Sequence, residues 1–138
     1  MTRPAIRFRS SEEAAIALAL AGPAGVLLLS APGAAAWPGA ATVAAMLDLA
    51  RAAHPAVPHD AALDCGSAPG LALDAIRQGW RLLVLAPHPA FPAVSAAAAE
   101  AGATLLSAAP ATLDLSRLDL RRPGGRAILA RHLGSLPS

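Results

Sequence analysis

Hydrophobic and polar positions along the chain follow two patterns, short apolar runs and longer stretches with helical spacing. The runs at residues 25–30 and 81–86 are almost continuously apolar, which is typical of strands buried on both faces of a sheet. Residues 5–9 instead alternate between apolar and arginine positions, which indicates a half-exposed strand at a sheet edge. The five predicted strands cover residues 5–9, 25–30, 61–64, 81–86 and 103–107.

Helix signals lie between these runs. Ser10, followed three residues later by Glu13, forms a capping box in which the serine hydroxyl accepts a hydrogen bond from the Glu13 amide. In the second helix the apolar residues recur at i, i+3, i+4 and i+7, which predicts one buried stripe. That stripe consists of Val43, Met46, Leu47 and Ala50. The predicted helices cover residues 11–21, 38–53, 69–78, 92–101 and 125–133.

The order of these elements predicts the fold class. Strands and helices that alternate with short connections form βαβ units with right-handed crossovers. We therefore predict one three-layer α/β/α domain over residues 1–138, with a mainly parallel sheet of about five strands. Half of a (β/α)-barrel, closed by a partner chain, is the alternative. The segment 108–138 leaves the pattern: we expect an irregular loop or a short extra element first, and fraying of the last residues.

Composition limits the chemistry. The chain lacks lysine, tyrosine and asparagine, which excludes a lysine Schiff base, a pyridoxal phosphate linkage and a Walker A phosphate loop. Abundant alanine and arginine are typical of a GC-rich genome, so the arginine content carries little functional information. The single cysteine, Cys65, excludes an intrachain disulfide and a multi-cysteine zinc site. A lone cysteine fits a reducing compartment, and we expect a cytoplasmic protein.

The chain gives no sign of a membrane segment or a nucleic-acid site. No apolar run reaches the ~18 residues of a membrane span, and arginines interrupt the N-terminus where a signal peptide would be apolar. Five arginines lie within residues 117–138, but no aromatic residue lies between them to stack on bases. These five, interpreted as a solvated helix face, are Arg117, Arg121, Arg122, Arg126 and Arg131.

The tetrapeptide Ser-Ala-Pro-Gly occurs twice, at residues 30–33 and 67–70, each time between a predicted strand and a helix. Ligands of open parallel sheets bind beyond the carboxyl ends of the strands, where both turns lie. Either these residues only cap helices and form tight turns, or their N–H groups and hydroxyls bind a small anionic metabolite. The candidate ligand-binding residues are Ser30, Gly33, Gly66, Ser67 and Gly70.

Asp64, Cys65 and His88 follow the third and fourth predicted strands and are the candidate catalytic residues. A thiol beside an imidazole can become a reactive thiolate. The alternative is that Cys65 is a small buried residue and His88 an exposed loop residue. Asp64 is the strongest candidate. An acid at the end of a buried strand loses its hydration, and this cost indicates that its carboxylate interacts with another group. It could also cap the third helix or accept N–H groups of its own turn.

The remaining special residues indicate structure rather than chemistry. We expect Trp37 to pack on the helix that follows it, and Trp80 to lie in the core or at an interface. The spacing of His54, His59 and Asp60 matches no helical pair of metal ligands. We therefore expect neither a metal ion nor a cofactor.

Two functions from different classes stay open. The first is a non-enzymatic binding or regulatory domain that self-associates, because the helix at residues 92–101 is apolar around most of its circumference and needs cover on more than one side. The second is a small or degenerate enzyme that uses Asp64, Cys65, Ser67 and His88 at the strand ends.

Overall fold

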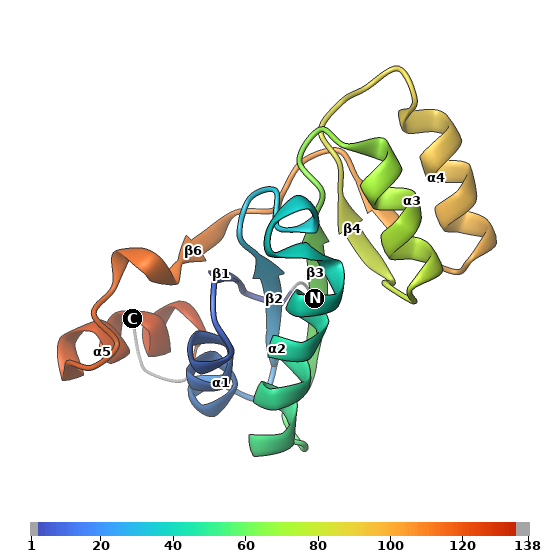
Figure 1. Ribbon diagram of the computed structural model, residues 1–138. Coiled ribbons are helices and arrows are strands. Elements are labelled where there is room, and N and C mark those ends of the chain that lie inside the picture. Colours follow the sequence, from blue (N-terminus) through green and yellow to red (C-terminus); the bar gives the residue numbers. More distant parts are fainter. Residues whose placement is uncertain (1–2, 135–138) are drawn as a thin grey trace. The chain divides into compact units, whose positions relative to one another are not determined.

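The computed structural model describes residues 3–134 and contains an α/β fold with a six-stranded parallel sheet (Figure 1). The strands are β1 (Ala5–Phe8), β2 (Val26–Ser30), β3 (His59–Asp64), β4 (Leu82–Val84), β5 (Thr104–Leu106) and β6 (Thr112–Asp114). Their order is β5-β4-β3-β2-β1-β6. This confirms the predicted class and is consistent with a three-layer α/β/α domain, with six strands where about five were predicted.

The five predicted helices are all present, with ends that differ by a few residues. They are α1 (Ser11–Leu20), α2 (Ala40–Ala53), α3 (Pro69–Arg77), α4 (Phe91–Glu100) and α5 (Pro123–His132). Two short helical turns, η1 (Ala35–Gly39) and η2 (Leu115–Arg117), precede α2 and follow β6. Within residues 3–134, every helix is too short or too polar to cross a membrane.

Contacts divide the chain into two compact units. Of the described residues, unit 1 takes those up to Leu29, the segment Ala45–Asp60 and those from Ala111 onward. Unit 2 takes Ser30–Ala44 and Ala61–Pro110. The organisation as one domain over residues 1–138 stays a prediction, and the expected fraying of the last residues concerns positions 135–138, outside the described residues.

In unit 1, β1 lies between two other strands. The Leu27 amide of β2 donates to the Pro4 carbonyl at 2.9 Å, and on the opposite side Ile6 of β1 is in register with Leu113 of β6. The prediction that β1 forms a sheet edge is therefore wrong. The segment left open as a loop or a short element supplies the neighbour, as a strand of three residues that is too short to give a periodic pattern.

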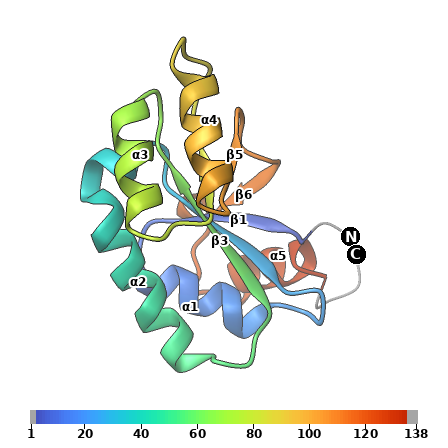
Figure 2. The ribbon, with the colours of Figure 1, turned by 90° about the vertical axis from the view of Figure 1, so that its right-hand side faces the viewer.

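Helix α1 begins at the predicted serine cap. The Ser10 hydroxyl accepts a hydrogen bond from the Glu13 amide at 3.1 Å. The Glu13 carboxylate accepts from the Arg9 amide at 2.7 Å, one residue earlier than in a standard capping box. Glu12 and Glu13 lie in the first turn, where negative charge suits the positive end of the helix dipole. The cap thus fixes the entry into α1, which contacts α5 (Figure 2).

In unit 2, β4 lies between β3 and β5, with Leu83 in register with both Leu63 and Leu105. Helices α3 and α4 contact each other and lie side by side in Figures 1 and 2. Trp80, just before β4, is buried, as predicted. Leu63 and Leu83 are buried and Leu105 is half-buried, so leucines in register hold the short strands of this unit together.

The other tryptophan contradicts its prediction. Trp37 in η1 is 83% exposed and does not pack on α2 as expected. Its backbone is extended (φ −149°, ψ 123°) within an otherwise helical turn. Because this interrupts the helical path before Ala40, the buried stripe of α2 does not continue to Trp37.

Candidate functional site

A hydrogen-bonded cluster in unit 2 joins the carboxyl ends of β2 and β3; it consists of Ser30, Gly33, Asp64 and Gly66 and is called the strand-end cluster. One carboxylate oxygen of Asp64 accepts from the Gly33 amide at 3.1 Å and from the Gly66 amide at 2.8 Å. The Asp64 amide donates to the Ser30 hydroxyl at 2.9 Å. Asp64 and Ser30 are buried, so a single carboxylate connects the two turns from inside.

The strand-end cluster brings together four of the predicted site residues. Asp64 accepts an N–H group of its own turn, as one of the sequence interpretations held, and in addition one from the turn of Gly33. A Cβ atom built on Gly66 would lie 3.6 Å from the Gly33 Cα, so the turns approach closely. The N–H groups predicted to bind an anion thus donate to an internal carboxylate.

The other predicted ligand-binding residues lie at the start of α3. Ser67 and Gly70 are exposed, and α3 begins without a side-chain cap. Ser67 therefore does not serve as the helix cap that its sequence position allowed. The role of these two residues in binding stays a prediction.

Cys65 and His88 differ in their surroundings. Burial, and to a smaller extent the charge of Asp64, raises the pKa of the Cys65 thiol to about 12. The thiol is buried and therefore stays protonated at neutral pH. His88 is exposed, and its Nδ1 accepts from the Ala90 amide of its own turn at 2.9 Å. These surroundings do not supply the thiolate that a Cys–His nucleophile needs.

His59 and Asp60, at the start of β3, have structural contacts. His59 Nε2 accepts from Arg51 Nε at 2.9 Å, and Asp60 forms an ion pair with Arg3 at 2.9 Å. Across the described part of the chain, no group of three or more His, Cys, Asp or Glu residues is placed to hold a metal ion.

A second candidate site lies in unit 1, where β1 and β6 end. From β1 the chain enters α1 and continues to β2, whereas β6 lies on the other side of β1 and leads into η2 and α5. Ligands of open parallel sheets bind at carboxyl ends where neighbouring connections diverge in this way. A pocket of about 610 Å³ lies there and is called the switch pocket. Its charged lining residues are Glu12, Glu13, Arg117, Asp119, Arg121 and Arg126.

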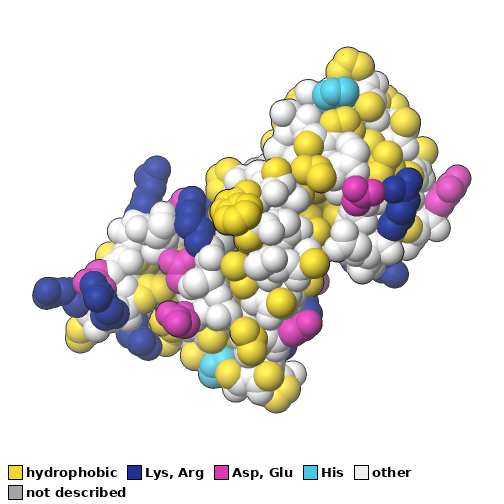
Figure 3. All heavy atoms as spheres, viewed as in Figure 1, with side chains coloured by type: hydrophobic (Ala, Val, Ile, Leu, Met, Phe, Trp, Pro, Cys, Tyr) yellow, Lys and Arg dark blue, Asp and Glu magenta, His cyan; other side chains and the backbone are white. Residues whose placement is uncertain are grey.

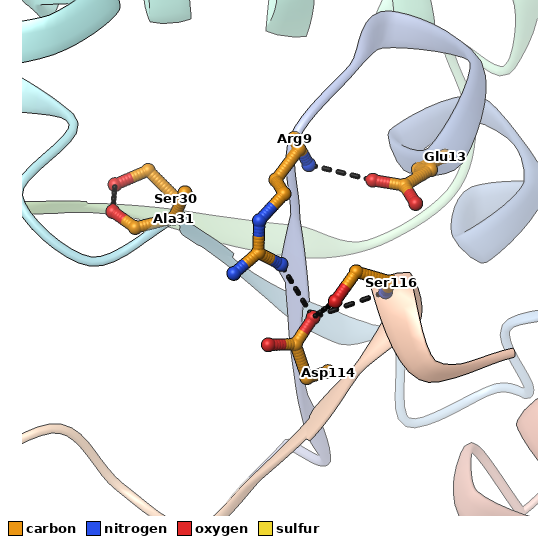
Figure 4. Close-up of polar contacts among 6 residues, drawn as sticks. All are labelled: Arg9, Glu13, Ser30, Ala31, Asp114 and Ser116. Carbon is orange, nitrogen blue, oxygen red and sulfur yellow. Dashed lines mark hydrogen bonds and ion pairs between the residues drawn. The ribbon is translucent and has the colours of Figure 1, made fainter.

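An ion pair between Arg9 and Asp114 connects the two strand ends next to the switch pocket (Figure 4). The same Asp114 oxygen accepts from the Ser116 amide at 3.0 Å and from its hydroxyl at 2.8 Å. Burial alone would raise the pKa of Asp114, but the hydrogen bonds from Arg9 and Ser116 outweigh it and lower the pKa to about 2. Asp114 is therefore ionised at neutral pH and holds the start of η2 against β1.

Asp114→Asn is expected to lower the free energy of unfolding at neutral pH by about 1 kcal/mol, because a partly exposed ion pair is screened by solvent. The folded-state pKa of about 2 lies below the ordinary value of 3.8. The ion pair therefore contributes fully above about pH 4, and its contribution is lost as the pH falls towards 2. Urea unfolding across this range would measure the difference between wild type and variant.

The control for this experiment is Asp48→Asn, which removes an exposed ion pair between Asp48 and Arg51, both in α2. This change is expected to alter stability by less than about 0.5 kcal/mol. A difference between wild type and Asp114→Asn that stays constant from neutral to acid pH would contradict the role assigned to Asp114.

Two acids that line the switch pocket, Asp119 and Glu13, accept hydrogen bonds from neighbouring residues. Asp119 accepts from the Arg121 amide at 3.1 Å, from Arg121 Nε at 3.3 Å and from Arg122 Nε at 3.3 Å. The backbone hydrogen bond of Arg121, followed by its side-chain bond, lowers the pKa of Asp119. Glu13 accepts from the Arg9 amide. Both carboxylates thus hold the local backbone.

Two of the three arginines that line the pocket, Arg126 and Arg117, make few contacts among the described residues. Arg126 Nε donates to the Leu120 carbonyl at 2.7 Å, and within residues 3–134 the other nitrogens of its guanidinium make no hydrogen bond or ion pair. Arg117 has no such partner in the same residues. In Figure 3 basic side chains gather over the part of the molecule labelled α5 in Figure 1, with acidic ones among them.

Sequence reasoning missed the switch pocket. It interpreted Arg117, Arg121 and Arg126 as part of a solvated helix face, because no aromatic residue lies between them. The tripeptide Leu-Asp-Leu occurs at residues 113–115 and again at 118–120, and this repeat was a usable signal, since its first copy contains Asp114 of β6. The pairing of this strand with β1 could not be read from the chain.

Comparisons with protein-family models, with curated proteins and with solved structures gave no match. A function for this chain therefore has to be argued from the geometry of the two candidate sites. Of these, the strand-end cluster is internally hydrogen-bonded. The switch pocket is lined by Arg117 and Arg126, whose guanidinium nitrogens, apart from Arg126 Nε, have no partner within residues 3–134.

Proposed function

We propose that the protein is a binding domain for a small acid, a carboxylate or phosphate compound, in the switch pocket. The observation that carries the proposal is Arg126, which lines the pocket while its Nε is held by the Leu120 carbonyl at 2.7 Å. A guanidinium fixed at Nε presents its two terminal nitrogens as a planar fork. This fork matches the oxygens of a carboxylate or phosphate and forms charge-assisted hydrogen bonds with them.

The other charges of the pocket support this assignment. Arg117 and Arg121 add positive charge to the lining, whereas Glu13 and Asp119 already accept hydrogen bonds from backbone and arginine donors. Glu12 is the third acid, in the first turn of α1. An incoming acid would therefore meet arginine donors at the Arg126 side of the pocket and be repelled from the side of Glu12.

Binding is favoured over catalysis. A catalytic role at the strand ends would need a reactive group, but the Cys65 thiol has a raised pKa and is buried. Asp64 directs one carboxylate oxygen to two backbone amides. The enzyme hypothesis for Asp64, Cys65, Ser67 and His88 therefore has less support than the binding hypothesis.

The proposal is tested by titrating the protein with butyrate and with inorganic phosphate under NMR detection. Either acid is expected to shift the Arg126 Nε–H resonance and the amides around Leu120 at millimolar concentration. Arg126→Gln should weaken binding by about 10- to 100-fold, which corresponds to the loss of one charge-assisted contact. Arg126→Lys should also weaken it, because lysine keeps the charge but lacks the fork and the anchored Nε.

The matched control is Arg131→Gln, an exposed arginine of the last turn of α5 that does not line the switch pocket. It should bind both acids as the wild type does. Equal weakening by Arg126→Gln and Arg131→Gln would indicate unspecific charge attraction. That result, or unchanged Arg126 resonances at saturating acid, would refute the proposal.

We also propose that the protein self-associates in a reducing, cytoplasmic environment. Helix α4 exposes Ala93, Ala96 and Ala99, and small side chains let a second helix approach closely. The single cysteine is reduced and buried, which suits a reducing compartment. A monomeric mass by light scattering at micromolar concentration would contradict self-association.

A further inference from the structure

A second pocket of unit 1 shares two side chains with the switch pocket. It also measures about 610 Å³ and lies between the end of α1 and the start of α5; it is called the helix groove. Its apolar lining residues are Ala19, Leu20, Ala21, Pro123, Ala127 and Ala130. Arg121 and Arg126 complete its lining and also line the switch pocket. Among the described residues that form the helix groove, none is acidic.

We infer that the ligand is a free monocarboxylic acid with an apolar chain, whose carboxylate binds Arg126 and whose chain lies in the helix groove. The inference rests on the proposed function and names the class of acid. Charge complementarity supports it, because the described lining of the helix groove carries two arginines and no acid, while the rest of this lining is apolar. A purely polar acid would leave this apolar surface in water.

Small side chains create the space for such a chain. Alanine predominates where α1 and α5 face the groove, so neither helix fills the space between them. Leu20 and Ala127 are half-buried and thus partly hydrated in the free protein. Covering these groups with methylenes removes apolar surface from water on both partners, which is the favourable term in such binding.

The arginines at the junction direct the orientation of the acid. Arg126 is anchored to the Leu120 carbonyl, and Arg121 Nε is bonded to Asp119 at 3.3 Å. Arg126 is thereby held where the two pockets adjoin, and Arg121 also lines both pockets. A carboxylate at this junction meets the guanidinium fork, and a chain attached to it reaches the helix groove.

The test compares butyrate, hexanoate and octanoate by NMR titration of the full chain. Each methylene that enters the helix groove should tighten binding about three- to fourfold, so octanoate should bind on the order of 100-fold more tightly than butyrate. Ala127→Gln places a polar amide in the groove and should abolish most of this gain while butyrate still shifts Arg126. Ala45→Gln, the same change at an exposed position of α2, should keep the full gain.

The outcomes separate this inference from the proposed function. If butyrate shifts Arg126 but octanoate binds no more tightly, the chain does not use the groove and the inference fails alone. Octanol, tested on the wild type, should bind far more weakly than octanoate; equal binding would overturn the role of the carboxylate. If none of the acids affects Arg126, both proposals fall.

Discussion

Replacing Asp64 with alanine is expected to lower the free energy of unfolding by about 3 kcal/mol, the larger part of it from two amides left without a partner. One Asp64 oxygen accepts from Gly33, 31 residues earlier, and from Gly66 in its own turn. Asp64 is buried, so water cannot easily replace the missing acceptor. Urea unfolding of wild type and Asp64→Ala would measure the loss.

A milder substitution distinguishes the acceptor from the charge. Asp64→Asn keeps one carbonyl oxygen that can accept both amides, and it should cost about 1 kcal/mol, because hydrogen bonds to a neutral acceptor are weaker. The control is Asp74→Asn in α3 of the same unit, where an exposed carboxylate pairs with Arg77. It should change stability by less than about 0.5 kcal/mol.

These variants also distinguish a structural Asp64 from a catalytic one. If the strand-end cluster joins the two turns, stability follows the number of accepting oxygens, in the order Asp, Asn, Ala. Unchanged stability in Asp64→Ala would mean that the turns hold without the carboxylate. A structural role would then no longer explain the burial of Asp64, and the enzyme hypothesis for this residue would gain support.

Gly125→Ala is expected to destabilise the protein by about 3 kcal/mol, in contrast to the same change one residue earlier. A Cβ atom on Gly125 would lie 2.2 Å from the carbonyl oxygen of Asp119 and 2.7 Å from its carbonyl carbon. Both are backbone atoms, so α5 or the preceding loop must shift, and overpacking of this kind costs about 1–3 kcal/mol or more.

Gly124 provides the matched control. A Cβ atom on Gly124 meets no atom within 4 Å, and both glycines lie in the first turn of α5. Gly124→Ala should therefore leave stability unchanged or raise it by about 0.5–1 kcal/mol, because alanine is the better helix former. Thermal unfolding of the two variants would give this comparison directly.

The same pair of variants links stability to the switch pocket. A shift of α5 away from Asp119 would also move Arg126 relative to Leu120, and so weaken the anchor at Nε. Gly125→Ala should therefore bind butyrate more weakly than Gly124→Ala. Equal stability and equal binding of the two variants would show that the close approach to Asp119 is unimportant.

The sequence by itself determined most of the local structure. Continuous apolar runs predicted β2 and β4, the buried stripe of Val43, Leu47 and Ala50 predicted α2, and Ser10 predicted the start of α1. These signals succeed because burial and capping depend on residues close together in the chain. The alternation of the elements then predicted the parallel α/β fold, since few connections are compatible with it.

Only the tertiary structure decided the sites. Asp64 could be singled out in the sequence, but its contact with Gly33 depends on how β2 and β3 pair. The pairing of β1 with β6 brings Arg9 next to Asp114, 105 residues away, and creates the switch pocket. A three-residue strand has no periodicity to reveal it, and pairing between distant segments is a property of the whole packed chain. The chemistry of single residues was therefore readable from the sequence, and their assembly was not.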